Sequence, residues 1–162
     1  MLDLPDSINC NVGIIGLGYV GLPLAIQIAK TKRCKKSEKP LNRYVIGFDT
    51  NKDRIDGLKN NYDQNGEYSS NYLNKIKGID YSNDMNDLIS CDVFIITVPT
   101  PIDNSKKPDL SCLKKASELV GNCMKSRILK NNISPVIIYE STVYPGLTED
   151  FCVPIIQQNS QL

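Results

Sequence analysis

Histidine and tryptophan are both absent from the 162-residue chain. Without histidine, any general acid or base has to be an Asp, Glu, Lys, Tyr or Cys side chain. Structural zinc sites are built from closely spaced cysteines, alone or with histidines, but the six cysteines, at positions 10, 34, 91, 112, 123 and 152, include no C-x-x-C pair. Only scattered thiolates are left as zinc ligands of this kind, and we expect no metal site.

The sequence also lacks an excess of either charge and lacks long apolar runs. Nineteen basic and eighteen acidic side chains give a net charge of +1, whereas nucleic-acid-binding domains show a marked basic excess. No apolar run reaches the roughly 18 residues of a membrane span, and residues 1–11 lack the basic and apolar segments of a signal peptide. We expect no nucleic-acid partner, no membrane partner and a cytoplasmic location, with most cysteines packed as small buried side chains.

The remaining composition, 41% hydrophobic and 23% charged, is that of a folded domain. The chain is too short for two ordinary domains, so we predict a single domain over residues 1–162. Apolar runs predict strands at 12–15, 44–48, 93–98 and 136–139, and helical spacing predicts helices at 19–30, 51–60, 84–89, 109–129 and 146–158. Ser82 or Asn83 is the expected cap of the third helix. Residues 30–39 are expected to be a basic loop, and residues 61–79 a polar loop with a short helix around 71–77. This alternation predicts the α/β class, with a doubly wound, mainly parallel sheet covered by helices on both faces.

A glycine-rich turn stands between the first expected strand and the first expected helix. Residues 16–21 read Gly-Leu-Gly-Tyr-Val-Gly and match G-x-G-x-x-G, the phosphate-binding turn of Rossmann-type dinucleotide folds. Gly16 is expected to make the tight turn, Gly18 to let a pyrophosphate approach the backbone, and Gly21 to let the helix pack against the strand. N–H groups at the helix N-terminus would bind the phosphates. The alternative is a tight turn that binds nothing.

An acidic residue, Asp49, follows the second expected strand. A carboxylate at this point accepts hydrogen bonds from the adenosine ribose and repels a 2′-phosphate, which favours NAD over NADP. It stands further from the glycine turn than the usual spacing of about 20 residues, and the basic loop at 30–39 accounts for the excess. The alternative is that Asp49 caps the next helix. Arg54, on that helix, is expected either beside the adenine or in solvent.

Three longer segments are more specific than the glycine turn. They read VGIIGLGYVGLP at 12–23, IITVPTPID at 95–103 followed by KPDL at 107–110, and YESTVYPGLTE at 139–149. Together they closely resemble the UDP-glucose/GDP-mannose dehydrogenase family, and within it the branch that oxidises UDP-N-acetyl-hexosamines. The resemblance runs from about residue 12 to residue 149.

The resemblance implies a two-domain enzyme of polysaccharide biosynthesis that oxidises the 6-hydroxyl of a UDP-sugar to a carboxylate with two NAD⁺. In such enzymes a cysteine holds the aldehyde as a thiohemiacetal, which is oxidised to a thioester and hydrolysed. That cysteine, and a lysine, an asparagine and a glutamate of the family's site, lie downstream of the segments matched here. The chain is therefore expected to be the N-terminal NAD-binding domain of a longer, homo-oligomeric enzyme. It is expected to be inactive alone and to need the other domain for its UDP-sugar substrate.

Carried onto this sequence, the resemblance also implies site residues. Those expected to bind the cofactor are Gly16, Gly18, Tyr19, Val20, Gly21, Asp49, Arg54, Val98, Pro99, Thr100, Thr142 and Thr148. Thr142 is also the expected catalytic residue, because its hydroxyl would position water or the 6-hydroxyl. The alternative for Ser141 and Thr142 is a capped strand-to-helix turn. Glu140 is expected to orient groups rather than to transfer a proton, and Cys152 to pack rather than to act as the nucleophile.

Two other readings of the function stay open from the residues alone. The first is a self-sufficient dinucleotide-binding module without catalysis, which would use the same glycine turn and Asp49. The second keeps the enzyme class but changes the family to the β-hydroxyacid dehydrogenases, which have a similar glycine turn. The segments at 98–101 and 140–146 fit that family poorly.

Overall fold

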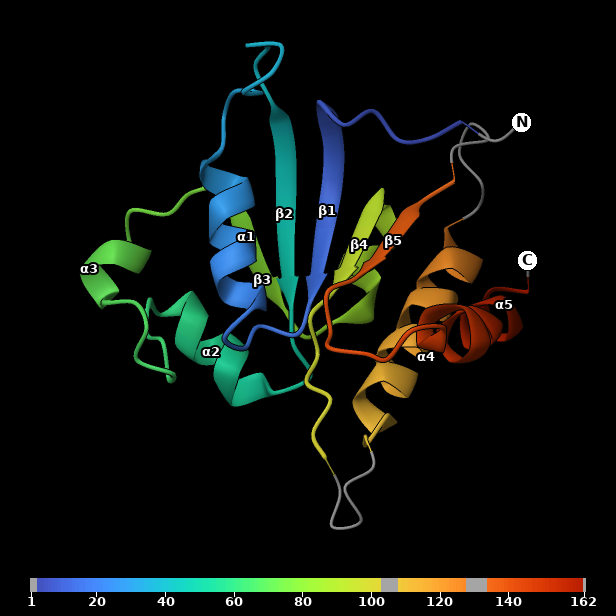
Figure 1. Ribbon diagram of the computed structural model, residues 1–162. Coiled ribbons are helices and arrows are strands. Elements are labelled where there is room, and N and C mark those ends of the chain that lie inside the picture. Colours follow the sequence, from blue (N-terminus) through green and yellow to red (C-terminus); the bar gives the residue numbers. More distant parts are fainter. Residues whose placement is uncertain (1–2, 103–107, 128–133, 162) are drawn as a thin grey trace.

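The computed structural model describes residues 3–102, 108–127 and 134–161. Its centre is a five-stranded parallel sheet with the order β3-β2-β1-β4-β5, with helices on both sides (Figure 1). The strands are β1 (Asn9–Ile15), β2 (Asn42–Phe48), β3 (Ile79–Ser82), β4 (Val93–Ile96) and β5 (Val136–Tyr139). From β1 the chain builds outward to β3, then returns to β4 on the other side of β1. This is a doubly wound sheet, so the predicted fold class is confirmed.

The helices connect and cover these strands. They are α1 (Gly21–Lys30), α2 (Lys52–Lys59), α3 (Ser70–Leu73), the 3₁₀-helix η1 (Met85–Ser90), α4 (Ser111–Ser126), the π-helical turn η2 (Thr148–Cys152) and α5 (Val153–Ser160). In Figure 1, α1 and α2 lie toward one end of the sheet, and α4 and α5 toward the other. The order of strands reverses between β1 and β4, and in such sheets ligands bind beside that reversal.

Successive residues of each central strand enter two separate hydrophobic cores. Ile14 of β1 packs in the core that includes α1, whereas Ile15 packs in the core that includes α4. In β4, Ile95 belongs to the first core and Ile96 to the second. Because neighbouring side chains of a strand point to opposite faces, a strand covered on both faces needs an unbroken apolar run. This is why these strands were visible in the sequence.

The polar segments depart from the predicted elements. Residues 79–82, of which only Ile79 fell in the predicted loop at 61–79, form the edge strand β3, which pairs with residues 45–48 of β2. The short helix expected around 71–77 is the single turn α3. Strand β4 ends at Ile96 rather than at residue 98. The predicted helical end at residue 129 lies outside the described residues.

The expected caps of the helix after β3 were wrong. This helix is η1, and its N-cap is Asp84, whose carboxylate accepts a hydrogen bond of 2.9 Å from the Asn86 N–H. The hydroxyl of Ser82 instead accepts the Asp84 N–H at 2.9 Å and donates to Asp87 at 2.5 Å. Ser82 therefore supports the turn that leads into η1 without capping it.

The last helix starts with a π-helical turn at a proline. The N–H of Val153 donates to the carbonyl of Thr148, five residues earlier, at the end of η2. Pro154 follows in the first turn of α5, and since proline has no N–H it cannot make the bond that would continue a regular helix backward. The single helix expected at 146–158 is therefore divided into η2 and α5.

Most of the cysteines are packed inside the domain, as predicted. Cys10, Cys91, Cys123 and Cys152 are buried, and all six cysteines are free thiols. Burial raises the pKa of the Cys91 and Cys123 thiols to about 12, so both stay protonated near neutral pH. Within the described ranges, every helix is too short or too polar to cross a lipid bilayer.

Candidate functional site

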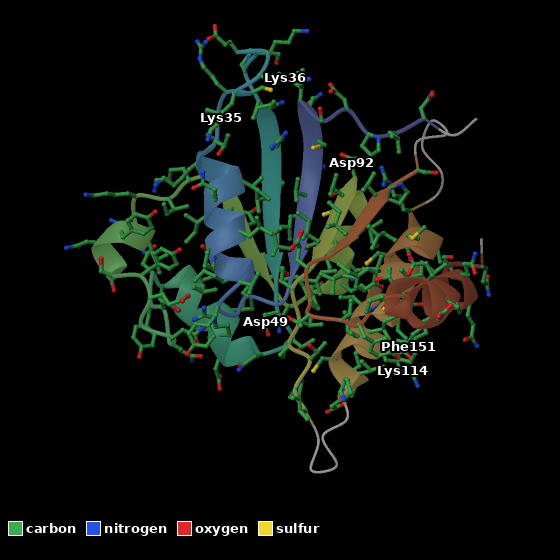
Figure 2. All side chains as sticks on the ribbon, viewed as in Figure 1. Lys35, Lys36, Asp49, Asp92, Lys114 and Phe151 are labelled. Atoms are coloured by element: carbon green, nitrogen blue, oxygen red, sulfur yellow. The ribbon has the colours of Figure 1, made fainter. Side chains whose placement is uncertain are left out.

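A cleft of about 810 Å³ lies along the carboxyl edge of the sheet, where the loops after β1, β2, β4 and β5 meet. Asp49, labelled in Figure 2, marks this edge. The residues of the predicted cofactor site that line the cleft are Gly16, Gly18, Tyr19, Val20, Asp49, Val98, Pro99, Thr100 and Thr142. Gly21, Arg54 and Thr148 do not line it. A second cavity, of about 700 Å³ beside β3, contains none of the predicted site residues.

The glycine turn has one position that is open to the cleft and one that the fold closes. Gly16 has φ of +96°, and its N–H donates to the Phe48 carbonyl at 2.8 Å. A Cβ on Gly18 would meet no atom within 4 Å, so a ligand can approach the backbone there. A Cβ on Gly21 would lie 1.8 Å from the Gly16 carbonyl oxygen. Gly21 therefore allows α1 to pack on the turn, which is the role expected of the third glycine.

Helix α1 points an uncapped N-terminus at the cleft. Its N-cap residue, Val20, has no side chain that bonds the first N–H groups. The N–H groups of Leu22 and Leu24 donate to the carbonyls of Gly18 and Val20, each at 3.2 Å. No described residue accepts a hydrogen bond from the N–H of Tyr19 or Val20. The N-terminus of α1 thus combines free N–H groups with the positive end of the helix dipole, and this combination favours the binding of an anion.

Thr97 fastens the glycine turn to the end of β4. Its hydroxyl oxygen lies 2.7 Å from the Gly16 carbonyl and 3.0 Å from the Ile15 carbonyl, and its N–H donates to the Ile15 carbonyl at 2.9 Å. The side chain is buried. Sequence reasoning did not single out Thr97, because a β-branched residue in an apolar run is also what an ordinary strand contains. Its hydroxyl at the end of that run was the available signal.

Asp49 joins β2 to the glycine turn. One carboxylate oxygen accepts the Leu17 N–H at 2.8 Å, and the other accepts the Asn51 N–H at 2.9 Å. The N-cap of α2 is Asn51, whose side chain accepts the Arg54 N–H at 3.2 Å. The alternative that Asp49 caps this helix was therefore wrong. A carboxylate has about four acceptor positions, so Asp49 keeps acceptor capacity toward the cleft that it lines.

Arg54 is buried, so the solvent position, one of the two expected for it, was wrong. Its residue is only 4% exposed, its Nε donates to the Leu17 carbonyl at 2.9 Å, and its Nη1 lies 2.5 Å from the Asp63 carboxylate. It is not in solvent, and its Nη2 is a buried donor without a hydrogen-bond partner among the described residues. The position beside the adenine stays a prediction. A buried guanidinium needs a counter-charge, and Asp63, nine residues later, supplies it. Nothing in the local pattern of α2 indicated that partner.

Two hydroxyl groups connect the loop after β5 to the loop after β4. The Ser141 hydroxyl donates to the Val98 carbonyl at 2.6 Å, and the Thr100 hydroxyl donates to the Thr142 carbonyl at 2.7 Å. One bond runs from each loop to the other. Ser141 bonds a carbonyl here and caps no helix, so the alternative of a capped turn was wrong for Ser141. The two bonds hold Thr142 at the cleft with its side chain exposed.

Three further residues lie in or near this loop and have roles predicted from the sequence. Glu140 is exposed and lines the cleft, and the orienting role of its carboxylate stays a prediction. Thr148 is partly buried in η2 and lies outside the cleft lining, because the turn at 144–147 carries the chain away from the edge of the sheet. Cys152 is fully buried in the core with α4, as expected for a packing residue.

The structure adds residues that the sequence did not indicate. Asn65 lines the cleft from the loop after α2, and Cys112, Lys115 and Leu119 line it from α4. Lys115 and Leu119 stand one helical turn apart and thus share a face of α4, but which face meets the cleft depends on the packing of the whole helix. Among the described residues, no three His, Cys, Asp or Glu side chains gather in the manner of a metal site.

The amino-acid sequence of the chain is similar to those of nucleotide-sugar dehydrogenases. Residues 10–162 match the NAD-binding domain of the UDP-glucose/GDP-mannose dehydrogenase family. Protein CapL of Staphylococcus aureus is 44% identical over 154 residues, which cover 95% of this chain and 32% of that protein. UDP-N-acetyl-D-glucosamine 6-dehydrogenase of Pseudomonas aeruginosa is 42% identical over 154 residues, with the same two coverages. The chain thus spans about a third of the length of these curated relatives.

Among solved structures, a UDP-glucose dehydrogenase from Pyrobaculum islandicum superposes with a TM-score of 0.78. The matched region covers 99% of this chain and 35% of that one, at 21% sequence identity. A likeness at this identity establishes the fold. The sequence comparisons and the fold therefore agree on one class of domain.

Proposed function

Because the chain belongs to the UDP-glucose/GDP-mannose dehydrogenase family, as its NAD-binding domain, we propose that it binds NAD⁺ along the cleft described above and forms the cofactor half of a UDP-sugar 6-dehydrogenase. The observation that carries this proposal is the glycine turn. Gly18 leaves open space above the backbone, and the uncapped N-terminus of α1 lies beside it. This cradle fits a pyrophosphate, which needs close approach to the backbone and several N–H donors.

At the adenosine side, Asp49 accepts hydrogen bonds from the ribose hydroxyls. It stands at the end of β2, and its carboxylate is already oriented by the Leu17 and Asn51 N–H groups. Fixing the acceptor before the ligand arrives lowers the entropy lost on binding. The negative charge repels a 2′-phosphate, and this makes NAD⁺ the preferred cofactor.

At the nicotinamide side, the loops after β4 and β5 form the wall of the site. NAD⁺ supplies the hydride acceptor when it is bound. Val98, Pro99 and Thr100 contact the cofactor, and Thr142 orients the reacting group by a hydrogen bond from its exposed hydroxyl. The bonds from Ser141 and Thr100 restrict the movement of Thr142, and a hydroxyl held in this way favours the transition state over other geometries.

The substrate that fits this family branch best is a UDP-N-acetyl-hexosamine, oxidised at its 6-hydroxyl for polysaccharide biosynthesis. The support is the relative of that activity at 42% identity. Since the chain covers 32% of that relative, we assign the sugar-binding residues and the nucleophilic cysteine to the remainder of a longer, homo-oligomeric parent enzyme. A cytoplasmic location agrees with six free thiols, because such thiols persist in a reducing compartment.

Calorimetric titration of the purified chain with NAD⁺ tests the proposal. We expect weak but measurable binding, and no reduction of NAD⁺ at 340 nm when UDP-N-acetylglucosamine is added. Gly18→Val should abolish binding while circular dichroism shows an unchanged fold, because the new side chain fills the space for the pyrophosphate and its Cβ has no protein atom within 4 Å. Normal NAD⁺ binding by folded Gly18→Val would refute the phosphate role. NAD⁺ reduction by the isolated chain would refute the division of the active site.

A further inference from the structure

The loop after α2 is organised around one buried carboxylate. The side chain of Asp63 has no exposed surface. It accepts hydrogen bonds from the backbone N–H groups of Asn65, Glu67 and Tyr68 at 3.1, 2.9 and 3.0 Å, and its fourth partner is Arg54. A carboxylate that collects several N–H groups fixes the path of the backbone around it. Residues 63–68, which we call the Asp63 loop, therefore have a backbone conformation that is fixed by the Asp63 carboxylate.

Arg54 connects the Asp63 loop to the glycine turn. Its Nη1 bonds the Asp63 carboxylate, and its Nε bonds the carbonyl of Leu17, the residue between the first two glycines of the turn. One rigid guanidinium thus sets the position of the loop relative to the turn. Burial alone would raise the pKa of Asp63, but the hydrogen bonds from Arg54 and from the Tyr68 and Asn65 N–H groups outweigh it and lower the pKa. The Asp63 carboxyl group is therefore charged at neutral pH.

Asn65 is the residue of the Asp63 loop that reaches the cofactor cleft. It lines the cleft together with Gly18, Tyr19 and Asp49. Its backbone N–H is used by Asp63, but no described residue forms a hydrogen bond with its side-chain amide. An amide carries two donors and an acceptor, so Asn65 offers unused hydrogen-bonding capacity at the wall of the cleft.

The position of Asn65 in the fold selects one half of the dinucleotide. The Asp63 loop follows α2, which follows Asp49, so it belongs to the β2 side of the reversal between β1 and β4. Thr142 and the nicotinamide wall belong to the β4 and β5 side. A ligand that spans the cleft with its pyrophosphate at the glycine turn places adenosine on the β2 side.

We propose that Asn65 contacts the adenosine half of NAD⁺ through its side-chain amide, and that Arg54 and Asp63 are positioning residues that present it. The inference rests on the proposed NAD⁺ binding and adds a recognition residue to it. It also gives Arg54 a role that its buried position allows, because Arg54 bonds both the Asp63 loop and the glycine turn.

The first test compares Asn65→Ala with Gln64→Ala by calorimetry, using NAD⁺, ADP-ribose and nicotinamide mononucleotide as ligands. Gln64 is the matched control, because it precedes Asn65 in the same loop, is exposed, and does not line the cleft. We expect Asn65→Ala to weaken NAD⁺ and ADP-ribose binding about five- to tenfold, the size of one hydrogen bond. Binding of nicotinamide mononucleotide, which lacks adenosine, should not change.

The outcomes separate this inference from the proposal beneath it. If the wild-type chain does not bind NAD⁺, the proposed function fails. If wild type binds and Asn65→Ala binds all three ligands as Gln64→Ala does, only the role of Asn65 fails. An equal loss for nicotinamide mononucleotide would place Asn65 away from the adenosine and overturn the inference as well.

A double-mutant cycle tests the positioning role. Arg54→Lys keeps the charge beside Asp63 but cannot reproduce the fork that bonds both Leu17 and Asp63. We expect Arg54→Lys to weaken NAD⁺ binding, and the double variant Arg54→Lys/Asn65→Ala to bind no more weakly than the weaker single variant. Losses that multiply would show that Arg54 acts independently of Asn65 and would overturn its positioning role. Should Arg54→Lys fail to fold, Asp63→Glu replaces it in the same cycle, since that change keeps the charge and displaces the carboxylate.

Discussion

On the β2 side of the cleft, charged side chains join the segments, whereas on the β5 side the segments are joined by hydroxyl groups. The β2 side has Asp49 bonded to the glycine turn and the ion pair of Arg54 with Asp63. The β5 side has the bonds of Ser141 to Val98 and of Thr100 to Thr142 between two loops. Hydrogen bonds to charged groups are roughly twice as strong as neutral ones.

This difference matches what each side has to recognise. Adenosine and pyrophosphate are the same for every NAD-dependent reaction, and one domain can hold every group that binds them. The nicotinamide side has to lie against the sugar substrate. Under the proposed function, this domain does not bind that substrate by itself. A site divided in this way has a self-contained recognition half and a reaction half that depends on further contacts.

The largest expected effect separates two of the three glycines of the turn, Gly21 and Gly18. Gly21→Ala places a methyl group 1.8 Å from a backbone oxygen, where no flexible side chain can move aside. We expect a loss of about 3 kcal/mol in the free energy of unfolding, the upper part of the range for overpacking. Gly18→Ala has open space and should keep wild-type stability. Urea denaturation measures both, and equal stability of the two variants would contradict the packing role of Gly21.

A second prediction concerns the reaction half. In the full-length parent, Thr142→Val should lower kcat about ten- to a hundredfold, which is one positioned hydrogen bond of about 1–3 kcal/mol. KM for NAD⁺ should hardly change, because the hydroxyl acts in the chemical step. Thr31→Val, at the end of α1, is the control for loss of a threonine hydroxyl. An unchanged kcat for Thr142→Val would leave Thr142 as a loop residue.

The third prediction tests the recognition half. Asp49→Ala removes both the ribose acceptor and the charge that repels a 2′-phosphate, so the ratio of NAD to NADP affinity should fall at least about tenfold, or ~1.4 kcal/mol. Asp49→Asn keeps an acceptor for the glycine turn but loses the charge. It should therefore bind NADP more tightly than wild type does, and it should keep more affinity for NAD⁺ than Asp49→Ala does. A ratio that stays constant in titrations of both variants would remove Asp49 from the ribose.

The smallest expected effect is a difference in pH dependence between the β2 side and the β5 side of the cleft. Because the pKa of Asp63 is lowered in the folded chain, its stabilisation is fully present above the ordinary carboxyl pKa of about 3.9 and is lost as the pH falls through the lower folded value. The neutral bonds of Ser141 and Thr100 do not change over this range. Carbon-13 NMR should give a midpoint for Asp63 below about 3.9. A titration midpoint at or above that value would contradict the stabilisation of the charged Asp63 carboxylate by its hydrogen bonds.

The parts of the fold that the sequence predicted are those that local patterns determine. β1, β2 and β5 are apolar runs, and the glycine turn needs glycine because of φ at Gly16 and close packing at Gly21. β3 was missed, since its Ile-Asp-Tyr-Ser sequence becomes a strand only by pairing with β2. The structure of such a segment depends on the strand with which it pairs, and the sequence of the segment itself does not indicate that strand.

The same distinction applies to the candidate site. Asp49 was predictable because it follows a recognisable strand. Arg54 was not, because its burial depends on Asp63, in a loop whose shape exists only after that carboxylate has gathered its N–H groups. Asn65 was invisible for the same reason. Thr97 carried a usable signal, a hydroxyl at the end of an apolar strand, but its contact with Gly16 required the pairing of β1 with β4.

The central place of β1 also has a consequence for the order in which the domain folds. Its pairing with β2 joins residues 33 positions apart (Asn9 with Asn42), whereas its pairing with β4 joins residues 81 positions apart (Val12 with Val93). Closing the longer loop costs about 0.8 kcal/mol more in chain entropy, and contacts between distant residues form slowly. We expect the unit of β1, α1 and β2 to form first and β4 to join it later. The cleft exists only after that second step, so the slowest pairing in the sheet is the one that creates the place where the cofactor binds.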